Sequence, residues 1–176
     1  MPDMALLDIL THPDSRLKKV CTPVGDITPD LLRLADDMLA TMYGAPGIGL
    51  AAPQVGEMKR LAVLDCVKEE GADPRPVAFF NPVITWSSEE LKVYEEGCLS
   101  IPEQYADVER PAEVRVSWID RDGKLQEEHF DGLWATCLQH EIDHLNGKLF
   151  IDYLKPLKRQ MITRRMVKWK REKARA

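Results

Sequence analysis

The clearest periodic pattern of apolar residues lies between Thr28 and Gly44. Apolar side chains recur there every three or four residues, as they do along one face of a helix, at Leu31, Leu32, Ala35, Met38, Leu39 and Met42. Thr28 suits the N-cap, Pro29 suits the first helical position and Asp30 favours the positive helix end. The pattern therefore predicts a helix that begins at Pro29 and ends at Gly44.

Shorter apolar runs and alternating patterns predict strands. Candidate strands cover residues 59–66, 77–86, 89–94, 113–120 and 125–130. Asp122-Gly123 lies between the last two, where it favours a tight hairpin turn. A short helical turn is expected after Asp14. Prolines and glycines from 44 to 56 are expected to break any regular element there.

Two more helices are predicted, from about Asp131 or Gly132 to Asn146 with Gly147 as the stop, and from Pro156 to Lys173. Strands and helices do not alternate as βαβ units. The prediction is an α+β fold, with mainly antiparallel sheets around one central helix, a helix in the N-terminal half and a C-terminal helix. Residues 1–155 are expected to form one domain, from which 156–176 extend as a helix.

Composition narrows the class of protein. The chain has 176 residues, of which 44% are hydrophobic and 30% charged, as in a globular domain. No apolar run approaches the length of about 18 residues that indicates a membrane span. The first eight residues contain no basic segment of the secretory kind, so we expect a cytoplasmic protein with four reduced cysteines.

Charge is unevenly distributed. Residues 155–176 carry ten Lys/Arg and one Glu, so their net charge is +9 and that of the preceding residues is −14. A basic helix of this kind can contact an anionic partner. The alternative is a solvated helix that only balances an acidic body.

Candidate chemistry lies on the central helix, in the sequence His140-Glu141-Ile142-Asp143-His144. Residues four apart project from the same helix face, about 6 Å apart, so both imidazoles can bind one metal ion. Glu141 lies one step round the helix. A carboxylate there can take a proton from water activated by the ion and return it to a leaving group.

Two histidines leave a catalytic site one ligand short, since three protein ligands are usual. Cys137 shares the histidine face, but it lies seven residues from His144, about 10.5 Å along the axis, so a wall position beside the ion fits better. Cys98 follows a strand candidate and could reach the helix. The alternative for Cys98 is an ordinary buried cysteine.

Three segments together resemble the motifs of one enzyme family. Gly47-Ile-Gly-Leu-Ala-Ala-Pro-Gln54, Glu96-Gly-Cys-Leu-Ser100 and Gln139-His-Glu-Ile-Asp-His144 are similar to the motifs of peptide deformylases, in the same order and spacing. The resemblance covers essentially the whole chain and, through the C-terminal helix, fits the bacterial type 1 enzymes. It implies hydrolysis of the N-formyl group from the formyl-methionine of new chains, with release of formate. It also implies Cys98 as the third ligand and Fe²⁺ as the usual metal, with Zn²⁺, Ni²⁺ or Co²⁺ able to occupy the site.

The resemblance also implies roles for other residues. Glu141 is the expected general base, and the Gln54 amide and Leu99 backbone N–H are the expected donors to the oxyanion. Expected substrate-binding residues are Leu133, Thr136 and Cys137 by their helical spacing, Ile48 and Tyr94 by the resemblance, and Gly49 and Gly97 through their backbone. Candidate partners for the ligand imidazoles are Asp143, Glu96 and Gln139.

The implied partners are formyl-methionyl nascent peptides and, through the basic helix, the ribosome near its exit site; neither membrane nor DNA is expected. One competing interpretation is a zinc peptidase of the H-E-x-x-H type. Such enzymes usually take a third ligand from a downstream Glu or His, and only Asp152 and Glu172 are acidic after His144. The other is a non-catalytic ribosome-binding module with a structural metal. Structural sites normally have four ligands, and the sequence offers no convincing fourth.

Overall fold

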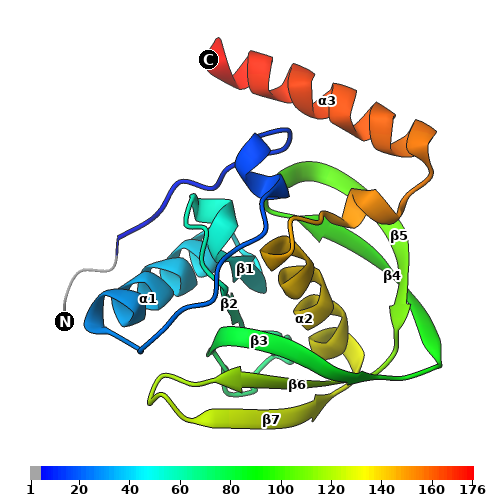
Figure 1. Ribbon diagram of the computed structural model, residues 1–176. Coiled ribbons are helices and arrows are strands. Elements are labelled where there is room, and N and C mark those ends of the chain that lie inside the picture. The colour runs from blue at the N-terminus through cyan, green and yellow to red at the C-terminus, as the bar shows by residue number, and fades with distance from the viewer. Residues whose placement is uncertain (1–4) are drawn as a thin grey trace.

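The computed structural model describes residues 5–176. The first four residues, part of the N-terminal segment discussed above, lie outside the described range. A five-stranded antiparallel sheet has the strand order β1 (Gly49–Ala51), β2 (Leu61–Leu64), β3 (Val77–Ser87), β6 (Val114–Ile119) and β7 (Leu125–Phe130). A separate antiparallel hairpin consists of β4 (Leu91–Cys98) and β5 (Ile101–Pro111). Figure 1 shows α2 enclosed between these two sheets.

Three α-helices accompany the sheets: α1 (Pro29–Gly44), α2 (Gly132–Leu145) and α3 (Pro156–Ala174). Their bounds agree with the predicted helices to within one residue. The Thr28 hydroxyl caps α1 by accepting a hydrogen bond from the Leu31 backbone N–H at 3.2 Å. Three short 3-10 turns are η1 (Ser15–Lys18), η2 (Ala52–Val55) and η3 (Phe150–Tyr153). The α+β prediction is confirmed.

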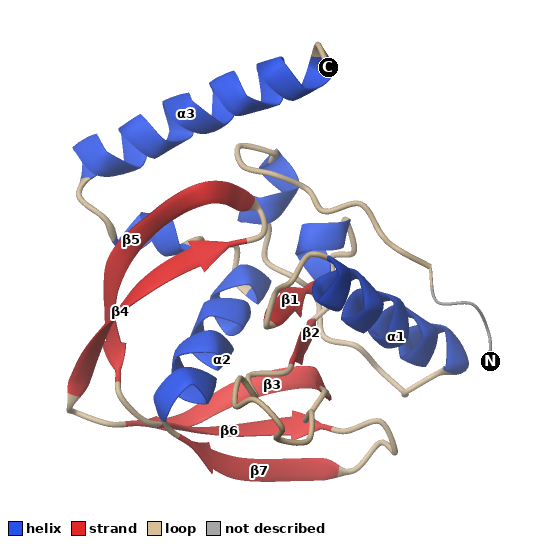
Figure 2. Ribbon diagram, turned by 180° about the vertical axis from the view of Figure 1, so that it is seen from behind, coloured by secondary structure: helices blue, strands red, loops and turns tan. Residues whose placement is uncertain are grey.

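Strand β2 lies between helices α1 and α2. All four of its residues are buried, because its two faces are covered by different helices. Leu61 and Val63 belong to the cluster that contains Met38 of α1, whereas Leu64 belongs to the cluster that contains Leu138 of α2. Such burial on both faces turns the alternating pattern of a strand into a continuous apolar run. Figure 2 shows α1 and α2 on the two sides of β1 and β2.

Helix α3 packs on the body through one narrow stripe. Ile162 and Met166 are buried in a third apolar cluster, and Trp169 packs against it. Two polar contacts add to this attachment. His12 Nε2 lies 2.9 Å from the Thr163 hydroxyl, and Lys170 donates to the Thr11 carbonyl at 2.8 Å. The rest of α3 faces solvent.

Two predictions about local structure were wrong. Strand β5 was not predicted at all, because its inward positions include Ala106 and Arg110 beside Val108, so the pattern does not look apolar. The segment 44–56 was expected to contain no regular element, yet β1 and η2 lie there. Pairing with β2 supplies the backbone hydrogen bonds that the local sequence does not favour.

Within residues 5–176, no helix combines the length and apolar character needed to cross a membrane.

Candidate metal centre

Three potential ligand atoms converge where α2 meets the end of β4. His140 and His144 lie one turn apart on α2, and their Nε2 atoms are 3.3 Å apart. Cys98, the last residue of β4, places its Sγ 3.4 Å from Nε2 of His144. All three ligand atoms lie within 4.8 Å of one another, and both histidines are buried.

This cluster fits a tetrahedral first-row ion. Ligand bonds of about 2.0–2.3 Å at tetrahedral angles place neighbouring ligand atoms roughly 3.3–3.6 Å apart. The two separations of 3.4 Å and 3.3 Å agree with that range. The donor set of two imidazoles and one thiolate suits several divalent transition metals.

Cys137 lies outside the cluster, as its spacing on α2 predicted. A hydrogen bond with Cys66 and burial raise the pKa of the Cys137 thiol, which therefore stays protonated. Cys137 lines the cavity beside the cluster. Its position is that of a wall residue, and its role there stays a prediction.

A buried ionic network holds the His140 ring. Glu96 lies 2.9 Å from Nδ1 of His140 and accepts two hydrogen bonds from Arg110, at 2.6 and 3.0 Å. Arg110 also donates to Asp143 at 2.8 Å, and the Tyr153 hydroxyl donates to the same carboxylate. Burial disfavours ionised Glu96, but these hydrogen bonds outweigh it and lower its pKa. Glu96 is therefore the partner that fixes the orientation of His140.

Of the three candidates for this role, Glu96 alone contacts a ligand imidazole within the described range. Gln139 donates instead to the backbone carbonyls of Pro111 and Ala135. Nδ1 of His144 is buried without a hydrogen-bond partner in residues 5–176. Burial lowers the pKa of His144, which favours the neutral imidazole that a metal requires.

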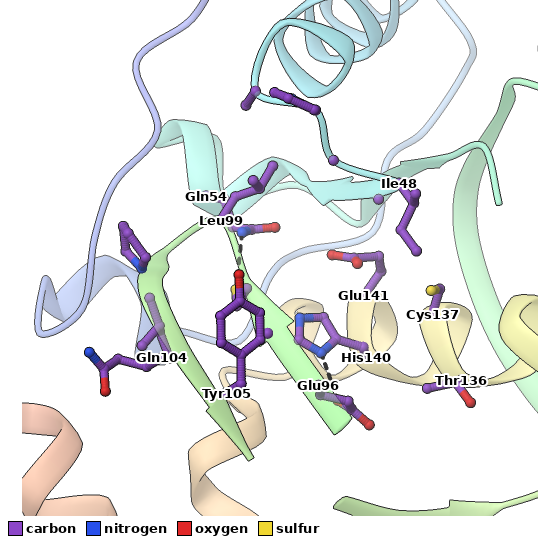
Figure 3. A pocket seen from close by; sticks show the side chains of 18 of the residues that line it. Ile48, Gln54, Glu96, Leu99, Gln104, Tyr105, Thr136, Cys137, His140 and Glu141 are labelled. Atoms are coloured by element: carbon purple, nitrogen blue, oxygen red, sulfur yellow. Dashed lines mark hydrogen bonds and ion pairs between the residues drawn. The ribbon is translucent and has the colours of Figure 1, made fainter. Parts of the chain in front are cut away.

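Glu141 points into the same cavity from the side opposite Glu96 (Figure 3). Its Oε1 is buried and has no hydrogen-bond partner in the described part of the chain. Burial raises the pKa of Glu141 to about 7. The backbone of Gly49 packs against it so closely that a Cβ there would lie 2.6 Å from Oε2 of Glu141. Gly49 thus limits the positions that the Glu141 carboxylate can take at the cavity wall.

Gln54 is held rigidly beside Cys98. Its Oε1 accepts a hydrogen bond from the Ala51 N–H at 2.9 Å. Its Nε2 donates to the Ser100 hydroxyl at 3.0 Å and lies 3.5 Å from the Cys98 sulfur. Only 1% of Gln54 is exposed. Since Oε1 is fixed by the backbone, the amide N–H₂ group must face the metal cluster.

The cavity around these groups has a volume of about 640 Å³. It is lined by most of the predicted site residues: Ile48, Gly49, Gln54, Tyr94, Gly97, Cys98, Leu99, Thr136, Cys137, His140 and Glu141. His144 and Leu133 are not among the lining residues: His144 is buried within the ligand cluster, and Leu133 packs against the core between α2 and the five-stranded sheet. The lining also includes Gln104 and Tyr105 of β5, which sequence reasoning missed together with their strand.

The sequence model that describes polypeptide deformylases matches residues 6–160. The chain belongs to this family. A peptide deformylase of Rhizobium meliloti (strain 1021) is 59% identical over 165 residues, which cover 94% of each chain. A crystal structure of a peptide deformylase from Legionella pneumophila has a TM-score of 0.90 and 48% identity, and the match covers 98% of this chain and 99% of that one. A deformylase of Ehrlichia chaffeensis in complex with actinonin has a TM-score of 0.91 and 38% identity, covering 96% and 99%.

Membership of the deformylase family decides between the three interpretations of the sequence. The protein is a metal-dependent hydrolase that removes the N-formyl group from nascent peptides. The zinc peptidase and the non-catalytic module are not favoured. The assignment of individual residues to steps of that reaction depends on the geometry described above.

Proposed function

We propose that this deformylase carries out hydrolysis at the cluster of Cys98, His140 and His144, with Glu141 as the proton carrier. One observation carries the proposal. Glu141, whose buried Oε1 has no hydrogen-bond partner within residues 5–176, lines the same cavity as Cys98 and His140, two of the three converging ligands. A polar oxygen buried without a partner is costly, so its retention favours a role in binding or chemistry.

The proposed metal is Fe²⁺, with Zn²⁺, Ni²⁺ or Co²⁺ as ions that the same ligands accept. When bound, a divalent ion polarises the formyl carbonyl and makes water acidic enough to react near neutral pH. Cys98 and the two histidines hold it, and Glu96 keeps the His140 ring in place.

Glu141 moves the proton. With a pKa of about 7, its carboxylate accepts a proton from the attacking water at neutral pH and can also release it. The leaving group is the amine of methionine, which needs one proton as the carbon–nitrogen bond breaks. Glu141 supplies that proton and returns to its ionised form, while formate leaves.

Gln54 and Leu99 are the proposed donors to the oxyanion. The Gln54 amide carries two N–H groups, of which one donates to the Ser100 hydroxyl and the other can donate to a carbonyl oxygen at the cluster beside the Cys98 sulfur. The Leu99 backbone N–H follows Cys98 directly. Losing one such donor typically lowers turnover by about 10²–10³-fold.

The methionine side chain is proposed to lie against the apolar wall of the cavity. Ile48, Thr136 and Cys137 line this wall, and Tyr94 lines the cavity from β4. The backbones of Gly49 and Gly97 offer hydrogen bonds to an extended peptide. Leu133 stays a prediction, and it would act from behind the wall rather than at the surface.

Residues 1–155 are proposed as the catalytic domain, with 156–176 as a basic helix that docks near the ribosomal exit. Support comes from the separate, one-sided attachment of α3 and its excess of cations. Nascent formylated chains are made in the cytoplasm of bacteria, so we propose this location.

The test uses iron-loaded protein under anaerobic conditions, with formate release from a formyl-methionyl tripeptide as the readout. The wild-type protein is expected to release formate, and actinonin is expected to inhibit it. Glu141→Ala is expected to keep its metal and lose turnover by at least 10²-fold, the scale of general acid–base catalysis. Retained turnover in that variant would contradict the assigned proton carrier.

A further inference from the structure

A second hollow adjoins the catalytic cavity. It lies between β5 and the first turns of α3, has a volume of about 370 Å³, and is called the α3 groove below. Gln104 and Tyr105 line both the catalytic cavity and the α3 groove. The two hollows therefore lie side by side, with these two residues of β5 as their common wall.

Tyr105 forms the boundary between the two hollows. Its ring lies directly on Gly97, because a Cβ at Gly97 would meet the ring at 2.6 Å. The side chain is nevertheless 63% exposed. In Figure 3 the Tyr105 ring stands in front of the cavity, and Gln104 extends toward α3. A chain that leaves the cavity along β5 must pass over this ring.

The lining of the α3 groove combines exposed apolar and basic side chains. Leu157 is 71% exposed and Met161 is 44% exposed, so α3 does not bury these two apolar side chains against the body. Lys155, Lys158 and Arg165 surround them, and the described lining contains no carboxylate. Arg165 also donates to Gln104 at 3.2 Å, which links the helix to the strand. Such a surface suits a peptide segment with apolar and acidic side chains.

We propose that the α3 groove binds the downstream part of the substrate polypeptide, and that it favours acidic and apolar residues there. This inference rests on the proposed function, which places the formyl group at Cys98. The β4–β5 pairing shifts register between Glu96 and Cys98, and this brings the Tyr105 ring against Gly97, the residue before Cys98. An extended substrate therefore passes Tyr105 with its first two or three residues and reaches the groove with the residues that follow. A tripeptide ends at about Tyr105.

The test compares three substrates of the holoenzyme: a formyl-methionyl tripeptide and two formyl-methionyl octapeptides. The octapeptides share their first four residues and carry either Leu and Glu or Leu and Lys at positions five to eight. The acidic octapeptide is expected to have a kcat/KM about three- to fivefold above that of the basic one at low salt, the scale of one exposed ion pair. The difference is expected to shrink at 0.5 M salt, where such charges are screened.

Variants then locate the effect. Lys158→Glu is expected to reduce the preference for the acidic octapeptide, because Lys155 and Arg165 leave the groove less positive but not negative, and Leu157→Ser to lower kcat/KM for both octapeptides. Lys168→Glu is the matched control, because it changes the same charge on an exposed part of the same helix outside the groove. All three variants are expected to process the tripeptide at the wild-type rate.

Equal kcat/KM for the two octapeptides would overturn the proposal. An equal effect of Lys158→Glu and Lys168→Glu would also overturn it, because the general charge of α3 would then be responsible. Absence of formate from the tripeptide would instead contradict the proposed function itself.

Discussion

Arg110 is not one of the converging ligands, but it holds Glu96, the carboxylate that contacts His140. It is buried between Glu96 and Asp143, and these two carboxylates need its charge. Removing one partner of such a network typically costs about 3–5 kcal/mol. Arg110→Met is therefore expected to lower the free energy of unfolding by that amount, as measured by urea denaturation.

The same variant is expected to bind metal about 10–100-fold more weakly, because Glu96 loses the group that positions it against His140. Competition with a chelator measures this. Arg110→Met/Glu96→Gln is the control, since it leaves no buried charge at position 96 but keeps an acceptor for His140. The double variant should be more stable than Arg110→Met. Equal stability of the two would mean that the unpaired charge is not what destabilises the protein.

Gly49 gives a second prediction for a single residue. A methyl group there would collide with Oε2 of Glu141, so Gly49→Ala must displace the carboxylate. Displacement of a catalytic group by about 1 Å can cost 10²-fold, and a fall of that order in kcat is expected with the metal content unchanged. Gly25→Ala is the control, because a Cβ at Gly25 meets nothing within 4 Å. Formate release at the wild-type rate from Gly49→Ala would show that Glu141 does not need its present position.

Among the elements, β5 shows where sequence reasoning reached its limit. The helices were predictable because caps and apolar spacing agree at Thr28 and Gly147. In β5, the inward phase runs through Ala106, Val108 and Arg110, so an arginine occupies a core position. A basic residue with no evident acidic partner in the sequence is normally predicted to be exposed. Only its two acidic partners, Glu96 on β4 and Asp143 on α2, could have indicated that a cation is buried at position 110.

Most of the residues predicted for the site come together in the structure. The spacing on α2 alone singles out His140, Glu141 and His144, whereas Cys98 was expected as the third ligand only from the resemblance to the family. Gln104, Tyr105 and Arg110 reach the site only through the pairing of β5 with β4. Leu133 shares the spacing of the α2 residues that line the cavity, but the five-stranded sheet covers that position. For the β5 residues and for Leu133 alike, tertiary contacts decide whether the side chain reaches the cavity, and residue spacing does not reveal those contacts.

Helix α3 carries the prediction that belongs to an element. Arg164 and Arg171 lie seven residues apart on its exposed side. If this side contacts ribosomal RNA, Arg164→Glu/Arg171→Glu is expected to weaken ribosome binding several-fold and to reduce its dependence on salt. Cosedimentation with ribosomes at several salt concentrations measures this. Turnover of a tripeptide should not change.

The control for the helix variant is Arg33→Glu/Lys124→Glu, which reverses two exposed charges elsewhere on the protein. It keeps the same net charge as the α3 variant. Ribosome binding that falls equally in both pairs would attribute the effect to net charge and contradict docking through α3.

At the scale of the whole molecule, His12 couples the N-terminal segment to α3 and makes stability depend on pH. Only 7% of His12 is exposed; Nε2 contacts Thr163, and Nδ1 is buried without a partner in the described structure. Burial, assisted by Lys18, lowers the pKa of His12 from its ordinary value of 6.5. The unfolded chain therefore binds a proton at this position more readily than the folded one. Stability from His12 is present above about pH 6.5 and is lost as the pH falls below it.

Glu141 titrates in the same range with the opposite sign. Its pKa is raised to about 7 in the folded protein, so protonation below that pH stabilises the folded state. The urea midpoint of the wild type is therefore compared with that of His12→Gln at each pH. Glu141 contributes equally to both proteins, so the difference reports His12 alone. We expect the urea midpoint of the wild type to fall more steeply than that of His12→Gln between pH 7.5 and 5.5. Parallel curves would mean that His12 can become charged without disturbing the contact between α3 and the body.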